Sequence, residues 1–175
     1  HGDFINTLEL EKNLTFPNLY KNLFSRMATY TINCADMLRA VSSSTEKQAL
    51  SFNSSKPVVR FPAWIDFEIF SSIEPMRDND GKFKILFIGS VTDRKKPHMI
   101  VDSLPKLISD QVELNIVGPT PNQNYLEILK DKIKSKNIED RVFIHGNKNR
   151  DEVKKFYSES NLMILPSVSE GLARV

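Results

Sequence analysis

The residues best suited to chemistry lie in turns that follow apolar runs in the second half of the chain. In the stretch NLMILPSVSEGLARV, residues 161–175, the apolar run 162–165 ends at Pro166 and leads through small residues to Glu170. A short continuous apolar run is typical of a strand buried on both faces of a parallel sheet. Glu170 would then lie on the loop just beyond that strand, where open α/β sheets bind ligands. The alternative is that Glu170 is a solvated loop acid.

Three further turns follow apolar runs in the same way. Because the carboxyl ends of parallel strands meet at one edge of a sheet, these turns and the Glu170 loop together predict a ligand-binding edge. Each glycine alone has a structural explanation, since a strand-to-helix turn often needs its backbone freedom. The residues directly after the three runs are Gly89, Ser90, Gly118, Gly146 and Asn147.

The first of these turns, GSVTDRKKP, carries positive charge. It places Arg94, Lys95 and Lys96 at the start of a helix that Pro97 opens. Cations at a helix N-terminus are unfavourable for stability, whereas the backbone N–H groups there attract anions. A phosphate bound between the amides and the ammonium groups would resolve this conflict, and such local conflicts are typical of functional sites. The alternative is a solvated charge cluster screened by salt.

The histidines and the cysteine indicate no further chemistry. His1, His98 and His145 are far apart in sequence and lack an HExxH or cysteine context, so no metal site is expected. The sequence also lacks GxSxG, Walker and GxGxxG patterns. We expect His98 and His145 to be packing or surface residues. Cys34 is the single cysteine, which excludes an intramolecular disulfide and fits a reducing compartment, and its apolar helical context predicts a buried, inert thiol.

The composition is that of a soluble globular protein. Of 175 residues, 40% are hydrophobic and 26% charged, and the net charge of +2 is too small to indicate nucleic-acid binding. No apolar run approaches the ~18 residues of a membrane-spanning helix, and no signal peptide is visible. The first residue is not methionine, which leaves open a natural N-terminus further upstream.

The first part of the chain predicts alternating helices and strands, and hence a parallel sheet. Pro17 opens a helix to about residue 33, and residues 37–41 form a strand. Ser43 and Glu46, three apart, predict a capping box for a short helix to about residue 50, and residues 56–61 form a second strand. Residues 62–81 mix aromatic residues with prolines and predict a linker, or else one long surface loop. Apolar residues recur at helical spacing in the first helix: Leu19, Leu23, Met27, Tyr30 and Cys34.

The second part alternates more regularly. We expect strands at 83–88, 112–117, 141–145 and 161–165. We expect helices at 97–109, with a kink at Pro105, at 122–136, and after a capping box of Asn149 and Glu152. Because βαβ units are right-handed, the helices should cover both faces of a parallel sheet. The expected inward residues are Ile100, Leu104, Leu107 and Ile108, then Leu126, Leu129 and Ile133, then Val153 and Phe156.

Four motifs of the second half resemble those of the donor-binding domain of retaining glycosyltransferases of the GT-B type, family four (glycosyl transferases group 1). In that family a strand is followed by Gly-Arg and later Lys-Gly, then come a Val-Gly loop, a Phe-x-Gly loop, and Pro-Ser-x-x-Glu-Gly with a second glutamate. The corresponding segments here are IGSVTDRKKP, IVGPT, FIHGN and LPSVSEGLARV.

The first half is also similar to this family. INCADMLRAVSSSTEKQAL resembles its Ala-Asp…Val-Ser-x-x-Thr segment, FPAWIDFEIF its interdomain hinge, and HGDF a histidine loop of its N-terminal domain. The resemblance implies an α/β fold of the GT-B type with two Rossmann-like parallel-sheet domains, both truncated here. Residues 1–61 would be the C-terminal part of the acceptor-side domain, 62–81 the interdomain linker, and 82–175 the nucleotide-sugar donor-binding domain, incomplete at its C-terminus.

The resemblance also implies roles for particular residues. Lys96 corresponds to the lysine that neutralises the donor diphosphate, assisted by Arg94 or Lys95. Glu170 corresponds to the first of two paired glutamates, which holds hydroxyls of the donor sugar, and His1 to a histidine facing that sugar. The implied site comprises Glu170, Lys96 and His1 for catalysis, Gly89, Ser90, Arg94, Lys95 and Lys96 for the diphosphate, and Gly118, Gly146, Asn147 and Lys148 for the base.

The sequence departs from the family pattern at several points. Ser90 stands where the family usually has arginine, and Pro97 replaces the glycine after the lysine. The second glutamate would fall beyond Val175, and the N-terminal Gly-rich loop would precede His1. We therefore expect an internal fragment of a longer enzyme that is inactive alone.

The expected activity is transfer of a hexosyl-type sugar, with retention, from a UDP-, GDP- or ADP-sugar to a saccharide or lipid-linked acceptor. No metal or other cofactor is implied, and the nucleotide sugar is a substrate. A cytoplasmic location is expected, and the resemblance also allows peripheral membrane association of the full-length protein. The resemblance further implies a role in polysaccharide biosynthesis.

The alternatives are a sugar-nucleotide epimerase of the same fold and a non-catalytic nucleotide-sugar-binding module. A response-regulator type of domain is disfavoured because no acidic cluster follows the first strand of the second part.

Overall fold

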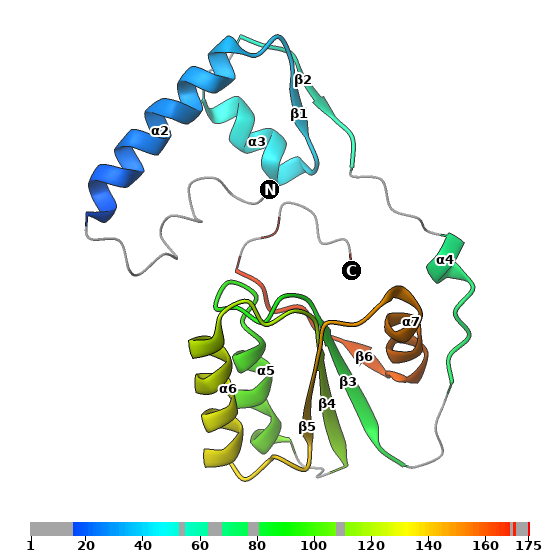
Figure 1. Cartoon of the computed structure of the whole chain (residues 1–175). Coiled ribbons are helices and arrows are strands. Elements are labelled where there is room, and N and C mark those ends of the chain that lie inside the picture. Colours follow the sequence, from blue (N-terminus) through cyan, green and yellow to red (C-terminus); the bar gives the residue numbers. More distant parts are fainter. Residues whose placement is uncertain are drawn as a thin grey trace. The chain divides into compact units, whose positions relative to one another are not determined.

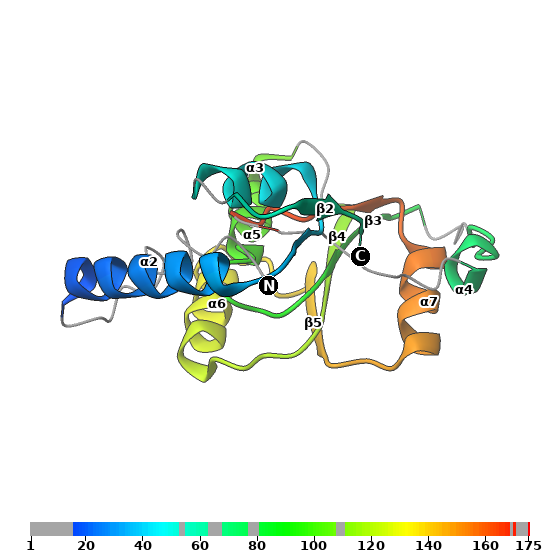
Figure 2. The ribbon, with the colours of Figure 1, turned by 90° about the horizontal axis from the view of Figure 1, so that it is seen from above.

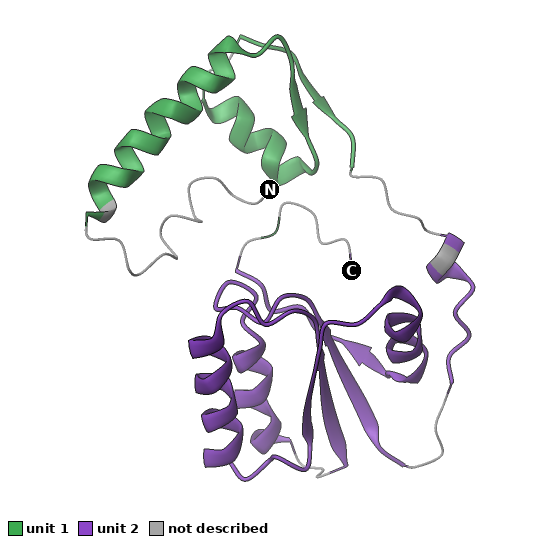
Figure 3. Cartoon of the chain, in the orientation of Figure 1, with its two compact units in different colours: residues 1–65, 169–174 green, residues 66–168, 175 purple. Residues whose placement is uncertain are grey.

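The computed structural model of the chain describes residues 16–52, 55–62, 68–76, 81–107, 111–168, 170 and 175. The chain forms two compact units, coloured separately in Figure 3. The first comprises residues 1–65 and 169–174, and the second comprises residues 66–168 and 175. In the described ranges, no helix combines the length and apolar character needed to cross a membrane.

The described part of the first unit alternates helix and strand. β1 and β2 pair in parallel, with Leu38 opposite Val58. This order and this pairing confirm the prediction for residues 17–61. The elements are α2 (Pro17–Cys34), β1 (Leu38–Ala40), α3 (Ser43–Ser51) and β2 (Val58–Arg60), labelled in Figure 1.

The capping box of α3 uses different residues from those predicted. Ser42 and Thr45 form it, because the Thr45 N–H donates to Ser42 Oγ at 3.3 Å and Thr45 Oγ1 accepts from the Ser42 N–H at 3.0 Å. The predicted pair of Ser43 and Glu46 is therefore wrong by one residue. A threonine hydroxyl accepts the same reciprocal bond as the glutamate of the usual box. Glu46 instead forms an ion pair with Arg60, at 3.4 Å.

The surface of α2 differs from the prediction at Cys34. The thiol is exposed, so the expectation of a buried cysteine is wrong. The helix itself is confirmed, with a proline in its first turn, and it ends where Ala35 adopts an extended backbone. Helical spacing shows which residues share a face, but it does not show what covers that face. In α2 the predicted stripe is largely exposed: Leu19, Leu23, Met27 and Tyr30 are each more than half accessible.

The second unit is a four-stranded parallel sheet covered by helices on both faces (Figures 1 and 2). The strand order is β5-β4-β3-β6, and every pairing is parallel. α5 and α6 lie on one face of the sheet and α7 on the other. This arrangement confirms the prediction of a Rossmann-like α/β sheet. The elements are α4 (Glu68–Ser71), β3 (Phe83–Ile88), α5 (Pro97–Ser103), the 3-10 turn η1 (Leu104–Lys106), β4 (Val112–Val117), α6 (Gln123–Ser135), β5 (Val142–Gly146), α7 (Arg150–Glu159) and β6 (Leu162–Met163).

The core of the second unit lies between the sheet and the α5–α6 layer. Alternate residues of β3 and β4 point into it, as the register of Ile85 opposite Leu114 and of Phe87 opposite Ile116 shows. The predicted stripe of α6, Leu126, Leu129 and Ile133, is buried as expected. The core cluster comprises Ile85, Phe87, Val91, Ile100, Val101, Leu104, Val112, Leu114, Ile116, Leu129, Ile133, Ile138 and Val142.

β6 is shorter and more exposed than predicted. It pairs with β3 at one end of the sheet, and its residues Leu162 and Met163 are 44% and 39% exposed. The expectation of a strand at 161–165 buried on both faces is therefore wrong. An apolar run of this length does not reveal whether a strand has one neighbour or two. The following residues, Ile164 and Leu165, do pack against the core.

The helix predicted for 97–109 ends earlier. Pro105 has no N–H to continue the helical ladder, and α5 changes into η1 at Leu104. Ile100 and Leu104 are buried as predicted, but Leu107 is 42% exposed and Ile108 lies outside the described residues.

β5 and α7 fit their predictions more closely. β5 begins one residue later than expected, after the buried Arg141. The capping box of Asn149 and Glu152 is confirmed, but Val153 and Phe156 are only half-buried.

Candidate functional site

The loops that follow β3, β4 and β5 meet at the carboxyl edge of the sheet. The Gly89 N–H donates to the Val117 carbonyl at 2.9 Å, and the Gly118 N–H donates to the Gly146 carbonyl at 2.8 Å. A second hydrogen bond joins the loops after β3 and β4, because the Val91 N–H donates to the Pro119 carbonyl at 2.9 Å. The structure thus brings the three predicted glycines together.

The loop after β6 joins the same edge. The Val168 N–H donates to the Arg94 carbonyl at 3.1 Å, which places the Pro-Ser segment beside the basic turn. In the described part of the chain, Ser167 Oγ is buried and has no hydrogen-bond partner. A buried hydroxyl without a partner costs free energy, so it marks this loop as a place where a bound group would be stabilised. The sequence predicts that this loop lies at the binding edge, but a lone serine carries no signal that would assign Ser167 itself to the site.

Gly118 is at the tightest point of this edge. A Cβ added to it would lie 2.2 Å from the Gly89 carbonyl oxygen, and its φ is +143°. Only glycine fits such a backbone without displacing its neighbour. Gly89, with φ +154°, lies beside the side chain of Lys95, since an added Cβ would be 3.9 Å from Lys95 Cδ and Cε. The alkyl chain of Lys95 therefore runs along this glycine.

The basic turn holds Lys96 in an unusual backbone conformation. Lys96 has φ 50° and ψ 44°, which is the left-handed region, and it is the N-cap residue of α5. For a residue with a Cβ this costs about 1–2 kcal/mol. The Thr92 carbonyl accepts from the N–H groups of Lys95 and Lys96, both at 3.1 Å, and the Lys96 carbonyl accepts from the Met99 N–H at 3.0 Å. Local hydrogen bonds on both sides thus maintain the strained residue, as is common at functional sites.

The three cations of this turn, Arg94, Lys95 and Lys96, are all half-buried. Among the described residues, no carboxylate forms an ion pair with Lys96. Arg94 and Lys95 each have an interaction within the chain. Ser90, the residue that replaces the family's arginine, is half-buried in the preceding loop.

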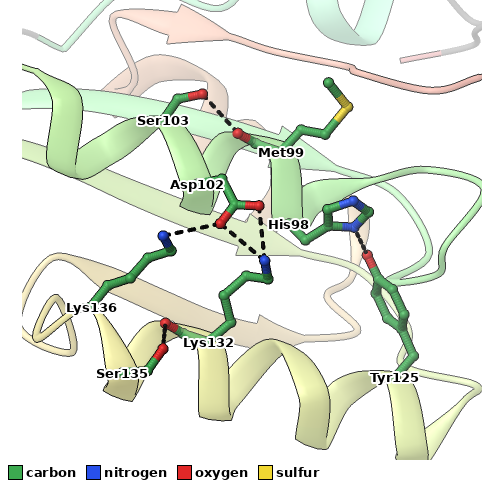
Figure 4. Close-up of polar contacts among 8 residues, drawn as sticks. All are labelled: His98, Met99, Asp102, Ser103, Tyr125, Lys132, Ser135 and Lys136. Carbon is green, nitrogen blue, oxygen red and sulfur yellow. Dashed lines mark hydrogen bonds and ion pairs between the residues drawn. The ribbon is translucent and has the colours of Figure 1, made fainter.

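His98 and Tyr125 form a hydrogen-bonded pair next to the basic turn (Figure 4). His98 Nδ1 and Tyr125 Oη are 2.7 Å apart, and the rings meet edge-on with centroids 6.0 Å apart. Burial lowers the pKa of His98 and raises the pKa of Tyr125 to about 12. The expectation that His98 is a packing or surface residue is confirmed, but no sequence pattern indicates its partner 27 positions away.

The loop predicted to contact the base lies at the end of β5. Gly146 has φ +70° and open space around it, Asn147 is exposed, and Lys148 Nζ pairs with Glu152 Oε1 at 3.0 Å. Glu152 also accepts from the Asn149 N–H, and these two bonds lower the pKa of its carboxyl, the backbone bond having the larger effect.

His145 packs below this loop. Its Nε2 lies 2.7 Å from Asn115 Oδ1, and its ring centroid lies 4.6 Å from that of Phe156. Burial lowers the pKa of His145, as does the nearby charge of Lys148. The expectation of a packing or surface histidine is confirmed.

Two predicted residues are not placed at this edge by the described structure. His1 lies outside the described residues. Glu170 is half-buried and belongs to the first unit, whereas Lys96 belongs to the second. Within the described residues, no group of three or more His, Cys, Asp or Glu side chains could hold a metal ion.

One apolar hollow of the second unit is lined by none of the predicted site residues. It has a volume of about 730 Å³ and is lined mainly by apolar side chains of β3, α5, η1 and β6, including Phe83, Ile100 and Leu162. None of the residues predicted to bind a nucleotide sugar lines it. The loop edge, rather than this hollow, is therefore the candidate site.

A parallel α/β sheet whose post-strand loops gather at one carboxyl edge, with a basic turn among them, defines a Rossmann-like ligand-binding domain. Residues 70–175 match the family described as glycosyl transferases group 1, and the chain belongs to this family. The resemblance read from the sequence motifs is thereby confirmed.

Several known proteins are similar to this chain. An uncharacterized glycosyltransferase of Methanocaldococcus jannaschii is 29% identical over 92 residues, which are 52% of this chain and 23% of that protein. Anabaena HepE, solved with UDP and glucose, superposes with a TM-score of 0.72 at 16% identity, covering 86% of this chain and 43% of HepE. Sucrose-phosphate synthase of Thermosynechococcus elongatus superposes with a TM-score of 0.77 at 17% identity, covering 97% of this chain and 44% of the synthase.

These similarities establish the fold. The chain spans less than half of the length of either solved relative and about a quarter of the M. jannaschii protein.

Proposed function

We propose that the protein containing this chain is a retaining glycosyltransferase that moves a sugar from a nucleoside diphosphate sugar to a saccharide or lipid-linked acceptor. The observation that carries the proposal is the basic turn at Lys96, fixed at the carboxyl edge of the sheet in a member of the glycosyl transferases group 1 family. GT-B architecture, with residues 1–61 and 82–175 in two domains joined by 62–81, is part of the same proposal.

The chemistry of the leaving group supports this role for the basic turn. When a nucleoside diphosphate departs, negative charge builds on phosphate oxygens, and fixed cations stabilise that charge. Lys96 is held by bonds on both sides of its strained backbone and has no carboxylate partner among the described residues. Its ammonium is therefore suited to a phosphate, with Arg94 and Lys95 beside it in the same turn. The loop amides of Gly89 and Ser90 would lie along the same diphosphate.

The loops at the ends of β4 and β5 are the proposed base-binding side. The residues that follow these two strands are Gly118, Gly146, Asn147 and Lys148. Backbone hydrogen bonds join the loop after β5 to the loop after β4, and the loop after β4 to the loop that carries the basic turn. UDP is the first nucleotide to test, because HepE was solved with it. Glu170 and His1 are proposed to contact the donor sugar, on the strength of their sequence motifs. Hydrogen bonds to sugar hydroxyls would orient the anomeric carbon for attack.

The proposal is tested by nucleotide titration and by transfer from the donor that the titration selects. Calorimetric titration of the whole protein with UDP, GDP and ADP should show saturable binding of one nucleotide in preference to the others. Transfer from the corresponding sugar nucleotide should follow, and Glu170→Ala should reduce turnover by a large factor while leaving nucleotide binding close to that of the wild type. Wild-type turnover of the Glu170→Ala variant would remove that residue from the site.

A second function is a non-catalytic nucleotide-sugar-binding module. The observation that favours it is Ser90, which stands where the family's motif has arginine. Saturable nucleotide binding without transfer or hydrolysis of any sugar nucleotide would support the module, whereas measurable transfer would exclude it.

A further inference from the structure

Helices α5 and α6 are joined by polar contacts at two places (Figure 4). At one end, His98 of α5 meets Tyr125 of α6, with 2.7 Å between Nδ1 and Oη. Further along α5, Asp102 accepts from Lys132 Nζ at 2.9 Å and pairs with Lys136 at 3.2 Å. Both contacts join α5 to α6. Of the two, the contact of His98 with Tyr125 lies at the N-terminal end of α5, next to the N-cap residue Lys96.

On the α6 side of the first contact, Tyr125 is held in place by its helix cap and by the core. The Tyr125 N–H donates to Oδ1 of Asn122, the N-cap residue of α6, at 3.0 Å. The next residue, Leu126, is buried, and Tyr125 itself packs against the core. The cap thus holds the backbone of Tyr125 and the core holds its ring, so the hydroxyl can act as a fixed hydrogen-bonding partner for α5.

On the α5 side of the first contact, His98 lies in the same helical turn that follows Lys96. His98 is two residues beyond Lys96, and the fully buried Pro97 lies between them. Lys96 has the strained left-handed backbone described above, so its conformation depends on what holds the first turn of α5. The charged groups that act on His98 are Asp93 and Lys96 from the turn, Asp102 from α5 and Lys132 from α6.

We propose that Tyr125 is a positioning residue for the donor diphosphate, acting through its hydrogen bond to His98 to fix the first turn of α5 and the direction of the Lys96 side chain. This inference rests on the proposed role of Lys96. The alternative is that the hydrogen bond between His98 and Tyr125 contributes only to helix packing. Its loss would then lower the stability of the protein without changing its affinity for the nucleotide.

A double-mutant cycle in the whole protein separates the two cases. Tyr125→Phe removes the hydroxyl and keeps the ring, and we expect it to weaken UDP binding about fivefold, the equivalent of one neutral hydrogen bond. In the Lys96→Ala background the same change should have no further effect, because the residue that it positions is gone. Asp102→Asn, which removes the charge of the other contact between the two helices, should leave UDP affinity within about twofold of the wild type.

Each outcome bears on a separate claim. Wild-type UDP affinity of Tyr125→Phe, or an equal loss with and without Lys96, would overturn the positioning role while leaving Lys96 in the site. Wild-type affinity of Lys96→Ala would instead refute the proposed diphosphate contact, and the positioning role with it.

Substitutions of His98 give an independent check in case Tyr125→Phe folds poorly. Asn can place a polar atom near the position of Nδ1, so His98→Asn should retain most of the UDP affinity. His98→Leu should lose as much affinity as Tyr125→Phe. Equal UDP affinities for the two His98 variants, at equal thermal stability, would contradict the proposal.

Discussion

Among the described glycines, Gly118 is the one with least room for a side chain. Its missing Cβ would meet the Gly89 carbonyl oxygen at 2.2 Å, whereas a Cβ at Gly146 would meet no atom within 4 Å. Both residues have a positive φ, so both substitutions to alanine cost backbone energy, but only the first also requires a backbone shift.

We therefore predict that Gly118→Ala lowers the free energy of unfolding by about 3 kcal/mol and Gly146→Ala by about 1 kcal/mol. Urea unfolding of the two variants and the wild type would measure the difference. Equal losses would show that the Gly89–Gly118 contact relaxes at little cost.

The two described histidines predict a pH dependence of stability. The pKa values of His98 and His145 are both lowered by burial, so the folded state favours their neutral forms. At pH values above the unfolded-state pKa of about 6.5, both imidazoles are neutral in the folded and in the unfolded state, so the contribution of these histidines to stability is fully present. As the pH falls below 6.5, the unfolded state binds protons first and the free energy of unfolding decreases.

His145→Gln tests this assignment, because glutamine cannot titrate but can still bond to Asn115 from near the position of Nε2. We expect the loss of stability between pH 7 and pH 5 to be smaller in this variant than in the wild type, as measured by urea unfolding at several pH values. An unchanged pH dependence would mean that His145 titrates normally in the folded protein.

At the scale of elements, local chemistry explains which segments were predicted well. β3 and β4 have the bounds 83–88 and 112–117 that their apolar runs predict, α6 begins one residue after the predicted start at Asn122, and α7 begins directly after the expected capping residue Asn149. Each of these signals is contained in a few neighbouring residues. The exposure of β6 depends on which strands flank it, and the break in α5 depends on how the chain responds to Pro105, so neither could be read from the pattern alone.

The same distinction applies to the site. The four post-strand turns were predictable because parallel strands bring their carboxyl ends to one edge. The contact of His98 with Tyr125 was not, because no periodicity links two side chains on different helices. Likewise, the sequence could not show that Lys96 has a left-handed backbone, since the residue before a proline usually adopts an extended one.

The capping box of α7 gives a prediction at this scale. Asn149 Oδ1 accepts from the N–H groups of Asp151 and Glu152, both at 3.0 Å. Asn149→Ala should lower the free energy of unfolding by about 1 kcal/mol, since it leaves these donors without a side-chain acceptor.

Lys155→Ala is the matched control on the same helix. The Lys155 side chain is exposed and, among the described residues, forms a surface pair with Glu159 alone, at 3.7 Å, so its loss should change stability by less than about 0.5 kcal/mol. Equal effects of the two substitutions in thermal unfolding would contradict the importance of the cap.

At the scale of the whole molecule, the chain combines the parallel sheet of the second unit, residues 66–168, with the first compact unit. The family match covers residues 70–175, and the solved relatives are more than twice as long as the part that this chain matches. The residues proposed to bind the donor diphosphate all lie in the second unit, whereas Glu170 belongs to the first.

The most direct measurement is the affinity of the whole protein for UDP, determined by calorimetry, for Lys96→Ala and for Lys130→Ala. Lys130 is an exposed lysine on α6, so its substitution removes the same charge outside the basic turn. We predict that Lys96→Ala weakens UDP binding by about tenfold or more, the scale of a charge-assisted contact to phosphate, and that Lys130→Ala binds as the wild type does. Equal affinities of the two variants would contradict the claim that the turn at Lys96 binds the donor diphosphate.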